Sequence, residues 1–301
     1  MEAPGFSSLS SGAASEARSL NDFVRPVEAF LSDPTQLAAA ADQFILNDID
    51  AMPPADLLAF LTGTLRPSHP IYPRIAERID TAIAKLKAAG PPPPGLTTAS
   101  ELRLFGERSA TGDTPQAQIV FDKFFLLGNQ PRTWDTFPAR FRDKKGVPDR
   151  SLWLAASTKD RLNTILQFSA LPGASRHHWG TEVDFNSVNV ADWRPPSGTL
   201  VNLGQWLQAN APKVGFIQAY TAGRSGGYNE EPWHYSYAPL SVGLRQRYSK
   251  LVNIQTDVID QIDKEFQKRA KAAGQTVPPD FKTELQNINI ADLVNNLGPG
   301  L

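Results

Sequence analysis

Two stretches, SRHHWGTEVD (175–184) and EEPWHYSY (230–237), decide how the fold and the chemistry of this sequence are interpreted. They hold three of the four histidines of the 301-residue chain, together with a concentration of carboxylates. Side chains alternate between the two faces of a strand, so His177 and Asp184 would lie on opposite faces of one continuous strand. Gly180 between them permits a turn. We therefore expect a loop that carries His177 to lead into a strand that carries Asp184.

The second stretch places Glu231 three residues before His234, and Pro232 between them forces an extended or turning backbone. His177, Asp184 and His234 then form a set of three nitrogen and oxygen ligands. Three protein ligands leave a fourth position for water, which is typical of a catalytic zinc site rather than a structural one. Zinc lowers the pKa of bound water and polarises a scissile carbonyl. Glu231 is not needed as a ligand and can act as the base for that water.

The composition excludes several other classes of protein. The chain contains no cysteine, so disulfide scaffolds, zinc ribbons and thiol nucleophiles are ruled out. Thirty basic residues stand against 31 acidic ones, which excludes a nucleic-acid binder driven by bulk charge. No apolar run approaches the ~18–20 residues that span a bilayer. The first residues, MEAPGFSSLSSGAASEA, show no signal peptide, so the protein is either cytoplasmic as made or a mature exported form.

The order S-x-H-x-x-G-x-x-x-D followed by E-x-W-H resembles the signature of the zinc D-Ala-D-Ala peptidases. SRHHWGT and EPWHY are especially similar to the VanY-type D,D-carboxypeptidases of the wider LAS group, which also holds lysostaphin-type peptidases and the hedgehog signalling domain. The positions that match are Ser175, His177, Gly180 and Asp184 in the first motif and Glu231, Trp233 and His234 in the second. The resemblance implies that His177, Asp184 and His234 bind one Zn²⁺ and that Glu231 is the general base.

The resemblance also implies a small, mainly antiparallel sheet flanked by helices, an α+β fold. The segments that predict strands are SLWLAAS (151–157), TEVDFNSV (181–188), GFIQAY (215–220) and WHYSYA (233–238). Helix starts are predicted at Pro34 and after Pro53. The predicted organisation is a flexible tail (1–19), a helical N-terminal region (20–90), a proline-rich linker (91–96), a zinc peptidase domain (97–245) and C-terminal helices that pack on it (246–301).

The residues that hold the substrate are less well defined. The family usually carries S-x-x-R-S upstream of the first motif, and its arginine helps to hold the substrate's carbonyl or terminal carboxylate. The corresponding region of this chain is AASTKDRLN (155–163), with Thr158 at the arginine position. The candidates for the missing positive charge are Lys159, Arg161, Arg176 and Arg224, and Ser175 is a further candidate for substrate contact. His178 and Trp233 are expected to support the metal ligands from behind.

The leading interpretation is a zinc carboxypeptidase that removes a terminal D-amino acid from the stem peptide of peptidoglycan or its precursors. Two alternatives stay open: an endopeptidase, lysin or delivered toxin that cuts wall cross-links, and a zinc-containing binding domain without catalysis. The site of action would be the periplasm or otherwise the cell wall. The N-terminal helices either pack on the catalytic domain or bind an unknown partner, and we expect no nucleic-acid partner and no transmembrane segment.

Overall fold

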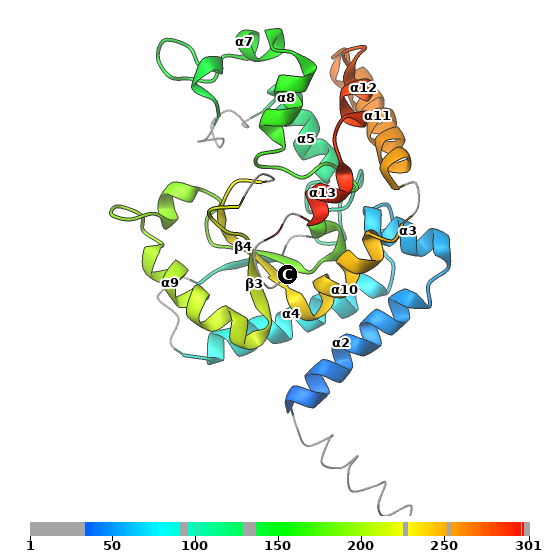
Figure 1. Ribbon diagram of the computed structural model, residues 1–301, viewed down its shortest axis with the longest axis vertical. Coiled ribbons are helices and arrows are strands. Elements are labelled where there is room, and N and C mark those ends of the chain that lie inside the picture. Colours follow the sequence, from blue (N-terminus) through cyan, green and yellow to red (C-terminus); the bar gives the residue numbers. More distant parts are fainter. Residues whose placement is uncertain are drawn as a thin grey trace, which may run out of the picture. The chain divides into compact units, whose positions relative to one another are not determined.

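The chain is α+β, with a small antiparallel sheet surrounded by helices, as predicted (Figure 1). The computed structural model describes residues 34–90, 96–100, 102–128, 137–224, 228–251, 254–295 and 297. The predicted tail 1–19 and most of the linker 91–96 lie outside these residues. No helix in the described part of the chain combines the length and the apolar character needed to cross a membrane.

The sheet aligns the two stretches that carry the histidines. Its strands are β1 (Thr98–Ser100), β2 (Glu182–Phe185), β3 (Phe216–Tyr220) and β4 (Glu231–Tyr237), in the order β1-β2-β4-β3 with every neighbouring pair antiparallel. In the register of β2 with β4, Asp184 faces His234 and Glu182 faces Ser236. Residues two apart on a strand share a face, so these four side chains lie together on one face of the sheet.

Helices make up most of the remaining described chain. The α-helices are α2 (Pro34–Asp50), α3 (Pro54–Thr62), α4 (Ile71–Ala88), α5 (Gln116–Phe125), α7 (Arg150–Ala155), α8 (Thr158–Ile165), α9 (Val201–Asn210), α10 (Ala238–Tyr248), α11 (Ile254–Ala273), α12 (Phe281–Gln286) and α13 (Ile290–Asn295). Short 3-10 turns are η1 (Ala139–Phe141), η2 (Arg176–Trp179), η3 (Val190–Trp193) and η4 (Ala211–Val214). The helix starts predicted at Pro34 and after Pro53 are confirmed.

One group of helices packs on the sheet. The isoleucines of α4 at positions 71, 75, 79 and 83 are buried on one helix face, as the spacing of an amphipathic helix requires. Helix α4 contacts η4, the turn that leads into β3, and Arg78 lies over the ring of Tyr237 at the end of β4. The indole of Trp179 donates a hydrogen bond of 3.0 Å to the carbonyl of Leu61 in α3. Helices α3 and α4 therefore share the core of the sheet.

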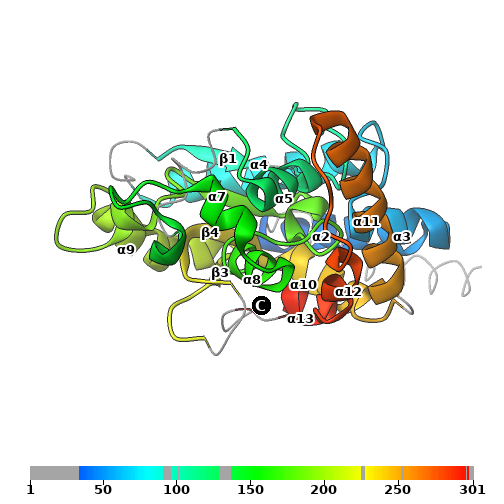
Figure 2. The ribbon, with the colours of Figure 1, turned by 90° about the horizontal axis from the view of Figure 1, so that it is seen from above.

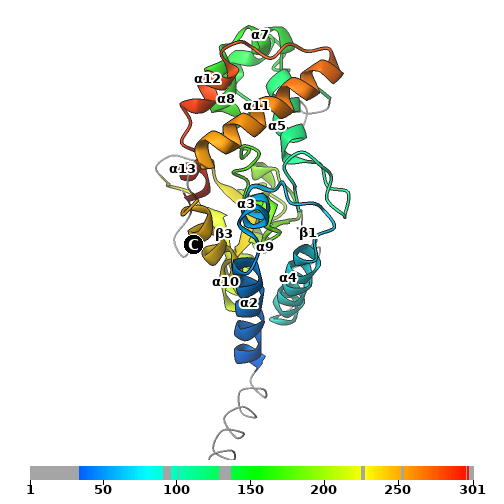
Figure 3. The same ribbon diagram turned by 90° about the vertical axis from the view of Figure 1, so that its right-hand side faces the viewer.

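A second group of helices gathers around an aromatic cluster. Figure 3 shows α5, α8, α11 and α12 side by side, away from β3, and Figure 2 shows the same helices from above. Phe124 of α5 meets Phe281 of α12 edge-on at 5.2 Å between ring centroids, and Phe266 of α11 stacks on Phe281 at 4.6 Å. Such aromatic pairs add about 0.5–1.5 kcal/mol each beyond the area they bury. This cluster fixes α5 beside the sheet, where it forms one wall of the site described below.

The prediction of a strand at 151–157 is wrong, because residues 151–155 belong to helix α7. The carboxylate of Asp149 accepts hydrogen bonds from the backbone N–H groups of Ser151 and Leu152, which is the N-cap arrangement that starts a helix. The side chain of Trp153 is fully buried, and its indole N–H points at the carbonyl oxygens of Lys123 and Phe124. Strand β1, by contrast, lies in a segment for which the sequence predicted no strand.

The chain divides into two compact units, residues 1–44 and 45–301, with the boundary within α2. The predicted domain limits, including the linker at 91–96, stay a prediction. The isoleucines on the buried face of α4 belong to the same hydrophobic core as Val183 and Phe216 of the sheet. Helices α3 and α4 and the C-terminal helices are thus parts of one unit with the sheet.

Candidate metal centre and active site

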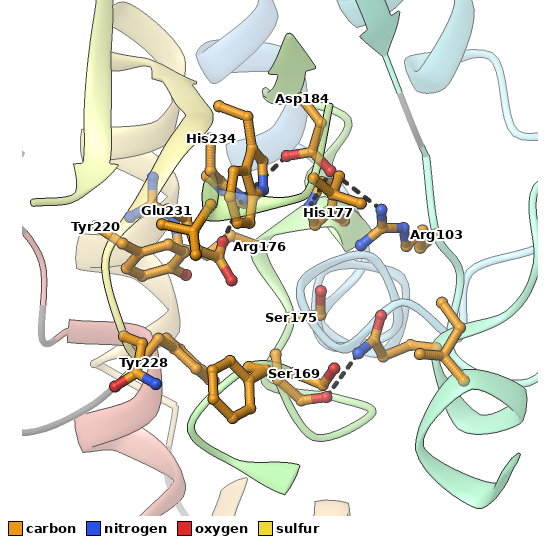
Figure 4. A pocket seen from close by; sticks show the side chains of 18 of the residues that line it. Arg103, Ser169, Ser175, Arg176, His177, Asp184, Tyr220, Tyr228, Glu231 and His234 are labelled. Atoms are coloured by element: carbon orange, nitrogen blue, oxygen red, sulfur yellow. Dashed lines mark hydrogen bonds and ion pairs between the residues drawn. The ribbon is translucent and has the colours of Figure 1, made fainter. Parts of the chain in front are cut away.

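A cavity of about 910 Å³ lies between the sheet and α5 and is lined by His177, Asp184, Glu231 and His234. This volume is in the range of sites that bind small molecules. Figure 4 shows these four side chains, drawn from η2, β2 and β4, grouped on one side of its open centre. Other parts of the wall come from α5, from the segments 112–114, 168–170 and 228–230, and from the segment 188–190 that follows β2.

The potential ligand atoms of His177, Asp184 and His234 all lie within 4.8 Å of one another. Nε2 of His177 is 3.9 Å from Oδ2 of Asp184, and Nδ1 of His234 is 3.2 Å from Oδ1 of Asp184. Two donors on one tetrahedral zinc ion at about 2.0–2.2 Å are about 3.4 Å apart. The three residues therefore need only small side-chain shifts to bind one ion.

Local backbone geometry explains how two short stretches supply all three groups. Residues Arg176–Trp179 form the turn η2, and Gly180 follows it with φ of 72°, a left-handed conformation that glycine adopts without strain. The chain then enters β2, whose Asp184 lies directly opposite His234 of β4. The loop carrying His177 and the strand carrying Asp184 thus have the form predicted for them.

A carboxylate behind the site fixes the orientation of His234. Nε2 of His234 lies 2.8 Å from Oε2 of Glu182, a side chain with 0% exposure. Arg176 donates a hydrogen bond to Oε1 of Glu182 at 2.9 Å. Burial raises the pKa of Glu182, but the charge of Arg176 and the hydrogen bond with His234 outweigh it and lower the pKa to about 2. An ionised Glu182 accepts a hydrogen bond from Nε2–H of His234, so that Nδ1 faces the cavity. Metal-binding histidines are commonly held by such a carboxylate.

The electrostatics of the cluster favour a bound cation. Burial, helped by the charge of Arg103, lowers the pKa of His177 well below its usual value, so this imidazole is neutral as a metal ligand must be. Burial also disfavours a charged His234, but the carboxylates of Asp184, Glu182 and Glu231 outweigh it and raise the pKa of His234. Oδ1 of Asp184 is buried, and its contact with Nδ1 of His234 at 3.2 Å is an ion pair rather than a well-formed hydrogen bond. A divalent cation fits this donor set.

Glu231 occupies the position expected of a base. Its Oε2 lies 3.3 Å from Nδ1 of His234, and its side chain is 14% exposed at the cavity. Glu231 is the first residue of β4 and pairs with Tyr220 beyond a register shift in β3. The ring of Tyr220 packs on His234 with centroids 4.8 Å apart. The carboxylate can therefore reach a water molecule beside the ligands without displacing any of them.

Only some of the residues that the sequence predicted to contact substrate line the cavity. Ser175 and Arg176 both line the cavity (Figure 4). The guanidinium of Arg176 is buried and donates to Glu182 and Ser236, while its Nη1 has no hydrogen-bond partner among the described residues. Neither Lys159 nor Arg161 lines the cavity: Lys159 is exposed on α8, and Arg161 is buried over the ring of Phe124 at 4.0 Å. The structure does not support a substrate role for either residue, because α8 belongs to the aromatic helix cluster.

Two further predicted residues have definite structural partners. Arg224 does not line the cavity; its guanidinium lies over the ring of Tyr220 at 5.1 Å and donates to the carbonyl of Thr221 at 3.1 Å. Its expected contact with substrate is therefore also unsupported. Trp233 lines the cavity and packs in the hydrophobic core.

Arg103 is a site residue that the sequence analysis missed. Its Nη2 donates to Oδ2 of Asp184 at 3.1 Å, and the side chain lines the cavity. The signal that could have found it is the S-x-x-R spacing at Ser100–Arg103, 72 residues before Ser175. In the segment 155–163, neither Lys159 nor Arg161 lines the cavity. Glu182 was missed too, although its place two residues before Asp184 on a strand puts both side chains on one face.

His178 supports the segment that carries Arg103. Its Nε2 accepts a hydrogen bond of 2.9 Å from the backbone N–H of Gly173, so Nδ1 carries the proton and donates it to the carbonyl oxygen of Arg103. Burial lowers the pKa of His178 to about 4, which keeps this ring neutral. The side chain thus lies behind the site and does not reach the cavity.

Comparison with known proteins agrees with this arrangement of a possible metal triad and a base in one cavity. A family model described as VanY, D-alanyl-D-alanine carboxypeptidase, matches residues 139–240, which include all three potential ligands and Glu231. An uncharacterized protein of Haemophilus influenzae is 33% identical over 90 residues, which cover 26% of this chain and 69% of that protein. No solved structure matches the chain significantly. The chain belongs to the VanY family of D-alanyl-D-alanine carboxypeptidases.

Proposed function

We propose that this protein is a zinc-dependent carboxypeptidase that removes the terminal D-alanine from peptidoglycan stem peptides or their precursors. The proposal rests on the contacts of the His234 ring. Its Nδ1 lies 3.2 Å from Oδ1 of Asp184 and 3.3 Å from Oε2 of Glu231, and its Nε2 contacts Glu182. This arrangement presents a ligand nitrogen and a separate carboxylate to the same small volume. Family membership supports the choice of substrate class.

In the proposed mechanism, His177 Nε2, Asp184 and His234 Nδ1 hold one Zn²⁺. The ion, when bound, supplies a Lewis acid for the scissile carbonyl and lowers the pKa of water. Glu231 accepts a proton from the attacking water and returns it to the amine nitrogen that leaves. General acid–base transfer of this kind contributes about 10²–10⁴-fold to a rate. Glu182 holds the His234 ring in place throughout, because its contact with Nε2 is fully buried.

Arg103 is assigned to the carbonyl of the scissile bond. It lies at the metal end of the cavity, where its guanidinium already contacts Oδ2 of Asp184. A cation at this position stabilises the negative charge that develops on the carbonyl oxygen during attack. His178 keeps the backbone of Arg103 in register through its Nδ1–H. The assignment agrees with the role that the S-x-x-R resemblance implies for this arginine.

Mass spectrometry of purified muropeptides, with monomers and cross-linked dimers incubated together, tests the proposal. The wild-type protein with zinc should remove one alanine mass from pentapeptides, and Glu231→Ala should not. Loss of alanine from tetrapeptides would indicate L,D-specificity, and conversion of dimers to monomers would replace the proposal with a cross-link endopeptidase. If zinc binds but no muropeptide changes, the hydrolytic function is refuted in favour of a binding domain.

The proposed activity places the protein at the cell wall, in the periplasm or outside the cell. Support comes from the substrate class of the family, since stem peptides occur there. Fractionation of cells that express the full-length protein tests this location. Recovery of the whole pool with cytosolic markers would contradict it.

A further inference from the structure

The segment 140–152, which runs from η1 into α7, combines an excess of basic residues with exposed apolar side chains. It holds five basic and two acidic residues in a chain whose charges nearly balance. Val147 is 55% exposed and Leu152 is 44% exposed, and Arg140, Lys144 and Lys145 are exposed as well. We call these five side chains the basic–apolar surface, and none of them lines the cavity. Exposed apolar side chains grouped with charges of one sign mark an interaction site.

The turn at the tip of this segment is held by its own hydrogen bonds. Oδ1 of Asp143 accepts hydrogen bonds from the backbone N–H groups of Lys145 and Val147, both at 2.8 Å. The N–H of Asp143 donates to the carbonyl of Val147 at 2.7 Å, and Nη1 of Arg142 donates to the carbonyl of Gly146 at 2.8 Å. Because the backbone is already ordered, little conformational freedom is lost when a partner binds the turn.

The base of the turn is anchored on a buried aromatic residue. The N–H of Asp149 donates to the carbonyl of Phe141 at 2.8 Å, and the ring of Phe141 meets the fully buried Trp153 edge-on at 5.0 Å between centroids. The guanidinium of Arg140 lies over the ring of Phe141 at 4.6 Å. Figure 1 and Figure 3 show α7 at the end of the aromatic helix cluster that is farther from β3. The basic–apolar surface is therefore fixed on the side of this cluster that is remote from β3.

The cations of this surface are not balanced by carboxylates of the described residues. The two carboxylates of the segment, Asp143 and Asp149, each accept hydrogen bonds from backbone N–H groups. Arg140, Lys144 and Lys145 form no ion pair with another described residue. Three cations beside two exposed apolar side chains are complementary to a partner that presents negative charge and apolar chains together.

We propose that the basic–apolar surface binds a lipid bilayer that carries anionic headgroups. Each lysine or arginine close to such a bilayer strengthens binding about fivefold. Val147 and Leu152 enter the boundary between headgroups and acyl chains, where apolar side chains are stabilised. A soluble polyanion would use the charges alone and would leave both apolar side chains in water. The proposal does not rest on the proposed hydrolysis, because no residue of this surface belongs to the cavity.

Sedimentation of the full-length protein with lipid vesicles tests the proposal. The vesicles contain phosphatidylcholine alone or with about 30% phosphatidylglycerol, an anionic lipid. Binding to the anionic vesicles should be at least about tenfold tighter and should weaken as salt is raised from about 50 to about 500 mM. Lys144→Gln combined with Lys145→Gln should weaken it by about 10–30-fold, and Val147→Ser by about 3–10-fold. Equal binding to both kinds of vesicle, or unchanged binding in the double lysine variant, would overturn the proposal.

The matched controls carry the same chemical changes elsewhere. Lys85→Gln combined with Lys87→Gln removes two exposed lysines from the last turn of α4, and Val188→Ser replaces a valine that is 63% exposed. Both controls should bind anionic vesicles as the wild type does, and circular dichroism checks that every variant is folded. If Val147→Ser keeps the full affinity for vesicles while heparin displaces the protein from them, the partner is a soluble polyanion and the bilayer is refuted.

The chain contains no cysteine, so a single introduced cysteine can report contact directly. An environment-sensitive fluorophore is attached to Val147→Cys or, as the control, to Val188→Cys. Anionic vesicles should shift the emission of the label at position 147 to the blue and leave the label at position 188 unchanged. An unshifted label at position 147, in protein that sediments with the vesicles, would assign the contact to another surface and overturn the proposal.

Discussion

Glu182 is the residue on which the orientation of His234 depends. It is fully buried, contacts Nε2 of His234, and receives a hydrogen bond from Arg176. We expect Glu182→Gln to weaken zinc binding by about 10–100-fold, because the neutral amide neither raises the basicity of His234 nor balances the charge of Arg176. Titration against a competing chelator measures this affinity.

Ser241→Ala is the control for Glu182→Gln. Ser241 Oγ lies 2.7 Å from Oγ of Ser236 in the same buried network, but it touches neither His234 nor Glu182. Zinc affinity of Ser241→Ala should stay within about threefold of wild type. Equal affinity in Glu182→Gln and wild type would contradict the positioning role of Glu182.

At the scale of elements, the C-terminus of α3 is packed against the ring that supports Arg103. Gly63 caps α3 with φ of 75°, and a Cβ added there would lie 2.4 Å from Cγ and Nδ1 of His178. Gly63→Ala should lower the free energy of unfolding by about 2–4 kcal/mol, from left-handed strain and overpacking together. Activity should fall as well, because His178 contacts the carbonyl of Arg103. Urea unfolding and hydrolysis assays measure the two effects.

Gly274 provides the comparison for this substitution. It follows α11 with φ of 62°, and no atom lies within 4 Å of an added Cβ. Gly274→Ala should therefore show the strain alone, about 1–2 kcal/mol, with unchanged activity. A loss in Gly63→Ala no larger than that in Gly274→Ala would show that the contact with His178 has no energetic consequence.

At the scale of the whole molecule, the potential ligands connect three elements, η2, β2 and β4, within one compact unit. A metal ion that binds only the folded chain should stabilise it by about 2.7 kcal/mol when free zinc exceeds Kd 100-fold. Zinc should raise the thermal midpoint of the wild type and a chelator should lower it. His177→Ala should lose this response.

His69→Ala controls for unspecific binding of zinc to histidine. His69 lies before α4, where its Nδ1 accepts a hydrogen bond of 3.3 Å from the N–H of Ile71, and it does not line the cavity. This variant should keep the full response to zinc. Stabilisation of His177→Ala to the same extent as the wild type would exclude the proposed metal centre.

The sequence predicted those features that depend on neighbours along the chain. Glycine at 180 permits the turn after His177, and strand alternation then places Asp184 on the face that meets His234. The candidate ligands and the candidate base lie within two short stretches, so their spacing carried enough information to propose the chemistry. Local pattern failed at 151–157, where the Asp149 cap outweighed strand propensity and started a helix.

Only the tertiary structure decided which distant side chains meet at the cavity. Arg103 contacts Asp184 across 81 residues, and Lys123 contacts Ser169 across 46. These pairs form because strand pairing and the aromatic helix cluster bring β1, α5 and the segment 168–170 to one place. Hydrophobic periodicity records that a helix or strand has a buried face, but it does not record which other element covers that face. For this reason the sequence named the candidate metal ligands, and the packing of the fold decided which basic residues line the cavity.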